Sequence, residues 1–209
     1  GGNDFAFPLY QSLSKIHSII NISAVDNRFD FGKIEKDFNS NSYMSKIIMN
    51  DNNCLNHFCN IGFQTFLNSQ EEMDLLNRLN FEFHRIGIIN RNIQKVEPLL
   101  RDTHLLSIDF KSIKASELNF AHNYPNGFKS DQICSISRYA GLSNSLSVIG
   151  FFEVLKSRIS SSLLSQAVWY FVEGYCLRIE EDPKSKNFNG HTYNVLCEGI
   201  NLKYYNSKL

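Results

Sequence analysis

Short apolar segments that alternate with longer amphipathic ones constrain the fold of this chain most. Residues 19–25 (IINISAV), 104–110 (HLLSIDF) and 146–154 (LSVIGFFEV) have the length and the β-branched or aromatic content of buried strands. Segments with helix signals lie between them, among them residues 69–80 and 130–141. Such alternation is typical of a parallel sheet with helices on both faces. We therefore predict an α/β fold.

The remaining segments extend this pattern. Ser69, followed by an acidic first turn, marks one helix start, and Gly141 is expected to close another helix. Further elements are expected at residues 4–16, 43–49 and 93–102 (helices) and 57–64, 192–200 and 202–207 (strands), with residues 81–88 left open. No repeat, linker or low-complexity block interrupts the chain, which predicts a single domain over residues 1–209.

The strongest helix signal lies at residues 160–181. Its apolar side chains form one continuous stripe at helical spacing, which predicts core packing rather than a binding surface. The members of this stripe are Leu163, Leu164, Ala167, Val168, Phe171, Val172, Tyr175, Cys176 and Ile179.

Composition narrows the classes of partner. The 21 lysine and arginine residues balance 21 aspartate and glutamate residues, so no global field favours nucleic acid or an anionic membrane. No apolar run approaches the roughly 20 residues that a membrane-spanning helix needs. We expect a cytoplasmic protein that binds neither nucleic acid nor a membrane.

The five cysteines and six histidines are scattered rather than grouped. An odd number of cysteines in apolar segments favours reduced, mostly buried thiols. Cys54 and Cys59 lack the short paired spacing of a zinc knuckle, so core packing is predicted for them. His57 and His104 lie beside or at the start of a strand, and a structural role is predicted for both.

Three of the predicted strands end in an acid. Asp26 follows the first, Asp109 the second and Glu153 the third. A single such residue is more often a helix cap or a turn former than a ligand. Three of them would meet at one edge of a parallel sheet, where ligands of α/β proteins gather. Carboxylate clusters of this kind suit hard cations such as Mn²⁺ or Mg²⁺.

The loop after the first strand, SAVDNRFDFGK, poses a sharper question. Asp26 and Asp30 are spaced as two ligands of one metal site, but Arg28 between them repels a cation. The sequence alone leaves three interpretations open. The loop is an intact metal loop, a metal loop that has lost its metal, or an ordinary salt-bridged turn.

Several short motifs, taken in order, resemble the arginase, agmatinase and formiminoglutamase group, the ureohydrolases. Gly1-Gly2-Asn3-Asp4 resembles the Gly-Gly-Asp-His motif of that group, and residues 26–30 (DNRFD) resemble its Asp-Ala-His-x-Asp motif. Residues 107–111 (SIDFK) resemble Ser-Phe-Asp-x-Asp, and residues 150–154 (GFFEV) resemble the strand with its substrate-facing glutamate. NIGFQ and YPNGFKSDQICSISRYAGLS are similar to a formiminoglutamase-like branch.

The resemblance implies a three-layer α/β/α sandwich and a centre of two manganese ions bridged by hydroxide. That water would attack a guanidino or formimino carbon. It further implies a homo-oligomer, and that the chain is the C-terminal two-thirds of a longer protein and lacks the first strands of the family. Asp26, Asp30 and Asp109 would be catalytic, these three and Asp4 would be metal ligands, and Glu153 and Asn126 would bind substrate.

The chain departs from the family pattern at the ligands themselves. Asp4 and Arg28 stand at histidine positions, and Lys111 stands at an aspartate position. Arg28 and Lys111 would supply positive charge without metal and would oppose a divalent ion. Two hypotheses follow: a manganese-dependent hydrolase of C–N bonds by descent, whose activity these replacements put in doubt, or a metal-free, non-catalytic relative that serves as a small-molecule binding or assembly module. Glu153 could accept a cationic substrate group or pair with Lys111 or Lys156.

Overall fold

The computed structural model describes residues 1–32, 39–50, 54–120, 123–179 and 190–207. It divides into two compact units, Gly1–Arg178 and Ile179–Leu209, and each is described by itself. The single domain expected over residues 1–209 stays a prediction. No helix in the described part of the chain is long and apolar enough to cross a membrane.

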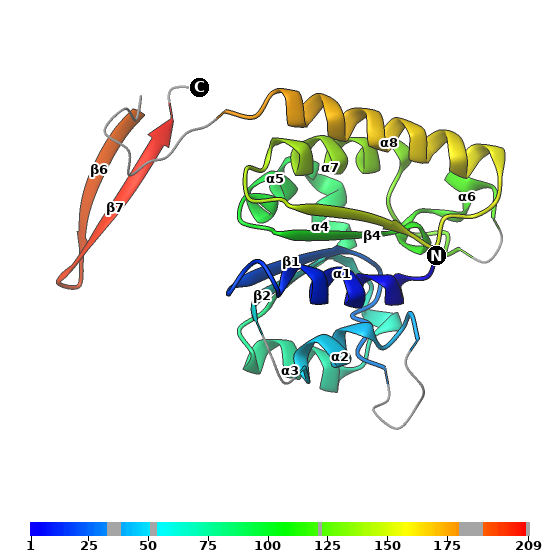
Figure 1. The fold of residues 1–209 in the computed structure, drawn as a ribbon, viewed down its shortest axis with the longest axis horizontal. Coiled ribbons are helices and arrows are strands. Elements are labelled where there is room, and N and C mark those ends of the chain that lie inside the picture. Colours follow the sequence, from blue (N-terminus) through cyan, green and yellow to red (C-terminus); the bar gives the residue numbers. More distant parts are fainter. Residues whose placement is uncertain (33–38, 51–53, 121–122, 180–189, 208–209) are drawn as a thin grey trace. The chain divides into compact units, whose positions relative to one another are not determined.

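A five-stranded, all-parallel sheet forms the centre of the first unit (Figure 1). Its order is β3-β2-β1-β4-β5. The α/β prediction is confirmed, because the three apolar segments that suggested it form the middle and one side of this sheet. The strands are β1 (Ile20–Val25), β2 (Leu55–Phe63), β3 (Glu82–Arg85), β4 (Leu105–Asp109) and β5 (Val148–Phe152).

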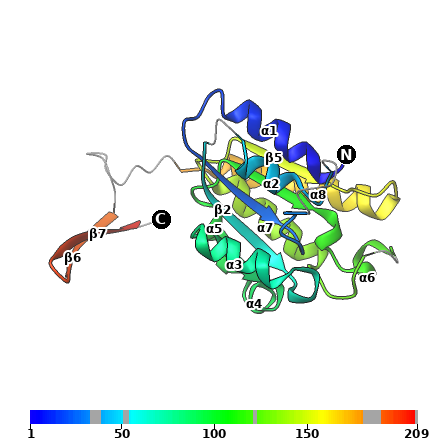
Figure 2. The same ribbon diagram turned by 90° about the horizontal axis from the view of Figure 1, so that it is seen from below.

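Helices cover both faces of the sheet (Figure 1), and Figure 2 views the sheet from the side of α1 (Ala6–Leu13), α2 (Tyr43–Ile48) and α3 (Gln70–Arg78). Each face has its own apolar core, so the three-layer arrangement is confirmed. One group comprises α1, α2 and α3; the other comprises α4 (Ile86–Arg91), α5 (Val96–Leu100), α7 (Ser130–Leu142) and α8 (Arg158–Cys176). A short helix, α6 (Ala115–Leu118), and 3-10 turns at Asn3–Phe5, Thr65–Leu67, Ile93–Lys95 and Phe110–Ser112 complete the unit.

Local sequence explains individual boundaries. The Ser69 hydroxyl accepts a hydrogen bond from the Glu72 amide (3.2 Å), and the Glu72 carboxylate accepts one from the Ser69 amide (2.7 Å). This capping box confirms the predicted start of α3. The segment left open at residues 81–88 forms β3 and the beginning of α4.

The contact between α7 and α8 corrects one expectation. Gly141 does not close α7, which continues to Leu142. A methyl group on Gly141 would lie 2.2 Å from the Phe171 carbonyl oxygen, and one on Gly174 would lie 2.2 Å from the Arg138 carbonyl oxygen. The two glycines therefore allow the helix backbones to approach each other directly.

The apolar stripe of α8 corrects a second expectation, that the whole stripe packs in the core. Leu163 and Ala167 are buried as predicted, but Val168, Val172 and Tyr175 are 43%, 51% and 55% exposed. The interpretation of the whole stripe as core is therefore wrong for its outer half. The stripe is wider than the side of the helix that packs against α7, and periodicity alone does not reveal how much of it finds a neighbour.

The second unit contains a hairpin of β6 (Gly190–Cys197) and β7 (Ile200–Ser207), which form a two-stranded antiparallel sheet. Glu198 and Gly199 have φ values of 48° and 82°, as a tight two-residue turn requires. The strands expected at residues 192–200 and 202–207 are confirmed as this hairpin. All five cysteines are free, but Cys176 and Cys197 are exposed, so the expected burial fails for those two.

Replacing Gly174 with alanine tests the helix contact. The added methyl group would meet the Arg138 carbonyl, so Gly174→Ala should lower the free energy of unfolding by about 1–3 kcal/mol. Gly87 in α4 has no atom within 4 Å of the corresponding position, and Gly87→Ala should leave stability unchanged or raise it by up to about 1 kcal/mol. Urea denaturation of both variants measures the difference; equal effects would contradict this packing.

Candidate functional site

Three buried aspartates come together at the carboxyl edge of the sheet. Asp26 directly follows β1, Asp109 ends β4, and Asp30 lies in the loop after β1; they are 2%, 5% and 5% exposed. Strands β1 and β4 are parallel neighbours with Val25 opposite Ile108, so the residues after them emerge side by side. The structure therefore brings together the three acids that the sequence analysis singled out as catalytic.

Backbone geometry explains how each loop turns. The Asp26 carboxylate accepts a hydrogen bond from the Arg28 amide (2.9 Å), and the Asp109 carboxylate accepts one from the Lys111 amide (2.6 Å). Both are aspartate turns of the ordinary kind. Asp30 has a φ of 54°, in the left-handed region that aspartate and asparagine tolerate better than most residues. The acids thus act as turn formers as well as cluster members.

Asn3 connects the acids to one another. Its side chain is fully buried, and its amide nitrogen lies 3.0 Å from an oxygen of Asp26 and 3.0 Å from an oxygen of Asp30. Its amide oxygen accepts a hydrogen bond from Ser107 on β4 (2.7 Å). The sequence analysis missed this residue. The available signal was an asparagine at the third position of the Gly-Gly-Asp-His-like stretch.

Burial makes these acids weak. Loss of solvent is the largest cause that raises the pKa of Asp26, Asp30 and Asp109, and the nearby carboxylates raise the values further. The pKa of Asp30 rises to about 7. The charge of Asp30 is the second cause of the raised pKa of Asp26, and the charge of Asp109 is the second cause of that of Asp30. Burial and mutual repulsion therefore favour the protonated form of these acids.

Lys111 and Arg28, the two cations at positions of family ligands, make different contacts. The Lys111 ammonium lies 3.0 Å from the Glu153 carboxylate, and its charge lowers the pKa of Asp26 and Asp109. The Arg28 guanidinium donates instead to the Leu67 carbonyl and the Tyr124 hydroxyl, each at 3.3 Å. A bridge from Arg28 to the carboxylates, which would have supported charge replacement, is therefore not formed.

The remaining predicted residues lie at the margin of the cluster. Asp4 and Glu153 approach each other beside Gly2, where an added methyl group would lie 2.4 Å and 3.2 Å from their carboxylate oxygens. Glu153 forms its ion pair with Lys111, one of the two lysines considered from the sequence. Asn126 belongs to a different part of this edge.

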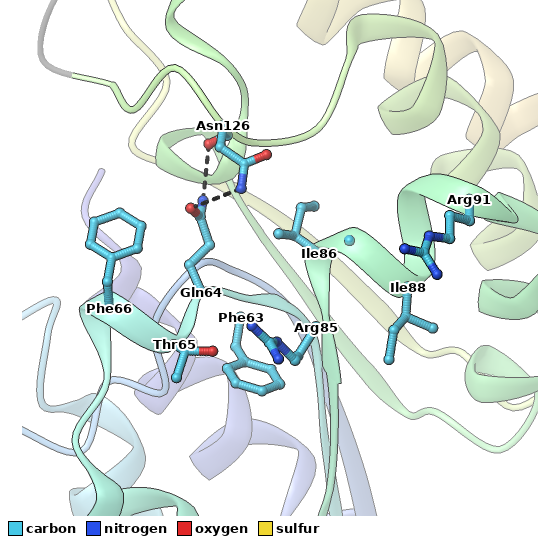
Figure 3. Close-up of a pocket in the computed structure, with 10 residues that line it drawn as sticks. Phe63, Gln64, Thr65, Phe66, Arg85, Ile86, Ile88, Arg91 and Asn126 are labelled. Atoms are coloured by element: carbon cyan, nitrogen blue, oxygen red, sulfur yellow. Dashed lines mark hydrogen bonds between the residues drawn. The ribbon is translucent and has the colours of Figure 1, made fainter.

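A cavity of about 540 Å³ lies where β2 and β3 end (Figure 3). The Asn126 side chain donates to the Gln64 side chain (3.3 Å), and the Gln64 amide donates to the Asn126 carbonyl (2.9 Å), which fixes one wall. Two cations, Arg85 and Arg91, line the cavity together with Phe63, Phe66 and Ile88, and none of its described lining residues is acidic. The sequence analysis did not find this cavity, because its walls come from separated segments.

The donor set does not suit two divalent ions. Histidines are missing at both expected positions, and the Asn3 amide donates to oxygens of both Asp26 and Asp30. Among the described residues, one group of three potential ligands has its atoms within 4.8 Å of each other, and Asp26, Asp30 and Asp109 are not that group. A two-manganese centre needs more ligand atoms at closer range.

Comparison with solved structures identifies the architecture. Formiminoglutamase of Trypanosoma cruzi, determined with Mn²⁺, superposes with a TM-score of 0.76 over 86% of this chain at 14% identity. The fold is that of the formiminoglutamases and arginases. Formimidoylglutamase of Bacillus subtilis gives 0.73 over 85% at 16% identity, and arginase of Bacillus cereus gives 0.67 over 82% at 12% identity.

The extent of these matches limits what they carry over. This chain spans 64% and 60% of the two formiminoglutamases and 68% of the arginase. No family model matches the sequence, and no curated protein sequence matches it significantly. The likeness therefore establishes the arginase-like fold predicted from the motifs, and activity must be argued from the residues.

The protonated cluster predicts a pH-dependent stability. The folded-state pKa of Asp30 is about 7 against 3.8 for the free side chain, so stability falls as the pH rises through that interval. Asp30→Asn keeps an oxygen for Asn3 and tolerates the positive φ. It should raise the free energy of unfolding by about 1–3 kcal/mol at pH 8 and change it little at pH 5.

Urea denaturation at both pH values, with a chelator present, checks this expectation. Asp74→Asn on the exposed side of α3 makes the same chemical change outside the cluster and should have no such pH dependence. A shift of equal size at pH 5 and pH 8 in Asp30→Asn would show that the cluster is not protonated as described.

Proposed function

We propose that this chain is a metal-free relative of the ureohydrolases that binds a small molecule at the carboxyl edge of its sheet and does not hydrolyse it. The observation that supports this most directly is the position of Asn3. Its amide nitrogen donates to both Asp26 and Asp30, so protein hydrogen bonds occupy oxygens that the resemblance assigns to manganese.

Electrostatics supports the same proposal. Two divalent ions would neutralise several carboxylates at once. Here the raised pKa values of Asp26 and Asp30 favour their neutral forms, and the Lys111 ammonium supplies positive charge. A unit charge about 4 Å from a divalent ion opposes it by several kcal/mol even at an effective dielectric constant of about 20. The retained acids then stabilise the loops of the edge rather than a metal.

The cavity beside the cluster suggests the class of ligand. Arg85 and Arg91 have no acidic neighbour among its described lining residues, so the cavity favours an anion. Gln64 and Asn126 add amide groups, and Phe63 and Ile88 add apolar surface. A formimino compound that carries carboxylates, such as formiminoglutamate, suits this lining better than agmatine, which has a cation at each end and no carboxylate. Asn126 keeps its predicted substrate-binding role in this proposal.

The second candidate is a manganese-dependent hydrolase by descent, acting on guanidino or formimino compounds. The retention of Asp26, Asp30 and Asp109 at one sheet edge favours it, with Asp4 nearby as a further oxygen donor. Its T. cruzi structural neighbour was determined with Mn²⁺. It requires that manganese displace the Asn3 hydrogen bonds and that the acids ionise.

Manganese titration separates the two candidates. The wild-type chain should bind Mn²⁺ weakly and release neither urea nor formamide from arginine, agmatine or formiminoglutamate. Restoring the family pattern with Asn3→Asp, Arg28→His and Lys111→Asp should raise manganese affinity by at least about tenfold, because it removes one amide donor and two cations. Electron paramagnetic resonance of free Mn²⁺ measures the binding.

A matched control keeps net charge from explaining the result. Lys114→Asp makes the same charge change as Lys111→Asp three residues further along the chain and should leave manganese affinity unchanged. Two tightly bound manganese ions in the wild-type chain would overturn the metal-free proposal. No gain in the triple variant would count against the assignment of Arg28 and Lys111 to former ligand positions.

Ligand binding tests the cavity separately. Formiminoglutamate should bind more tightly than agmatine in isothermal titration calorimetry. Replacing Arg85 or Arg91 with glutamine should weaken its binding about tenfold or more, since each removes a charged hydrogen-bond donor worth about 1.5–3 kcal/mol.

Arg101→Gln provides the control, because Arg101 is an exposed cation that pairs with Glu97 and does not line the cavity. It should leave formiminoglutamate binding unchanged. Equal loss in all three variants, or a preference for agmatine, would contradict an anion site at this edge.

A further inference from the structure

Four side chains with metal-binding atoms lie on one face of β2 and β3, away from the aspartate cluster. His57 and Cys59 alternate along β2, and Glu82 and His84 alternate along β3. In a strand, residues two apart point to the same face. Cys59 is the partner of Glu82 in the parallel register, which places the two pairs side by side.

The distances within this group are short. The ligand atoms of Cys59, Glu82 and His84 all lie within 4.8 Å of one another. The Glu82 carboxylate oxygens lie 3.2 Å from Nε2 of His84 and 3.8 Å from Nε2 of His57. A single carboxylate therefore stands between two imidazoles, with a thiol beside it.

We propose that Cys59, Glu82 and His84 bind a transition-metal ion of the zinc class, with His57, which lies beside Glu82, as its fourth ligand. One sulfur, two imidazole nitrogens and one carboxylate oxygen form a donor set that Zn²⁺ accepts in tetrahedral sites. Thiolate and imidazole ligands select such ions over Mn²⁺ or Mg²⁺, which prefer oxygen. The site is thus chemically distinct from the all-oxygen cluster at the carboxyl edge, and it does not depend on the function proposed there.

The exposure of three of these side chains gives an ion a route from solvent to the group. The side chains of His57, His84 and Glu82 are 34%, 31% and 51% exposed, whereas Cys59 is 1% exposed. An ion can therefore reach the carboxylate and imidazoles from solvent with the thiol as its inner ligand. The Phe81 ring packs edge-on against His57 with centroids 6.2 Å apart, which restricts that imidazole. Binding releases the thiol proton, since the thiolate is the ligand.

The bound ion would join the edge strand to the sheet. Strand β3 contains four residues and pairs with β2 on one side. Ligands from both strands would cross-link them through the ion, much as a disulfide restrains two segments. Metal binding to the folded state alone also stabilises it by mass action.

Cobalt substitution provides the spectroscopic test. The protein should bind one equivalent of Co²⁺ with a thiolate charge-transfer band in the near ultraviolet, and Zn²⁺ should displace it. All measurements use a Cys176→Ser, Cys197→Ser background, because these two thiols are exposed and could bind ions adventitiously. Cys59→Ser should remove the band and weaken Zn²⁺ binding by at least about tenfold.

Two further variants keep the test decisive. Cys134→Ser removes another buried thiol outside the group and should leave the band and the affinity unchanged. Glu82→Gln changes an exposed side chain that cannot disturb the core, and it should weaken Zn²⁺ binding and abolish the rise in melting temperature that Zn²⁺ gives the background protein. A background protein without the cobalt band, or Cys59→Ser and Glu82→Gln variants that bind as the background does, would overturn the site.

Discussion

The hydrogen bonds of the Asn3 amide organise the carboxyl edge of this sheet. Two carboxylates that are almost fully buried repel each other and lose solvation, which is costly unless each finds a donor. Asn3 donates to both, and Ser107 on β4 fixes the amide in turn. The beginning of the chain, the loop after β1 and the neighbouring strand are thereby connected through one side chain.

The proposed loss of metal would leave this edge with buried acids that need other partners. Removing a divalent ion from a set of buried acids would leave uncompensated charge, unless protons and side-chain donors replace it. Protonation favoured by the raised pKa values of Asp26 and Asp30, the Asn3 amide and the Lys111–Glu153 pair would serve as such replacements. Two of them, the Asn3 amide and Lys111, lie at positions where the chain departs from the ureohydrolase motifs.

Sequence patterns predicted the sheet well because period-two and apolar signals are local. The strands around Ala24, Ile61 and Ser107 needed only burial on both faces, and their parallel order followed from the intervening helices. Motif order even indicated the arginase-like fold at 12–16% identity to its solved neighbours. The direction in which a long side chain points depends on tertiary contacts, which local sequence does not reveal. Arg28 turned toward Leu67 and Tyr124, and no spacing rule states which of two neighbouring loops a guanidinium contacts.

Strands β2 and β3 also show that local sequence does not reveal which side chains meet. His57 and His84 were considered isolated and Cys59 a core thiol, because zinc motifs are recognised by close spacing within one segment. The signal was nevertheless present as two alternating pairs, His-x-Cys and Glu-x-His, each on one face of a strand. Only the parallel register of β2 with β3 brings the pairs together. A single sheet can therefore present two different clusters. One consists of carboxylate oxygens at the carboxyl edge, which accept hydrogen bonds from the Asn3 amide. The other adds sulfur and nitrogen atoms on one face of the outer strands, so the two would select different ions by ligand chemistry alone.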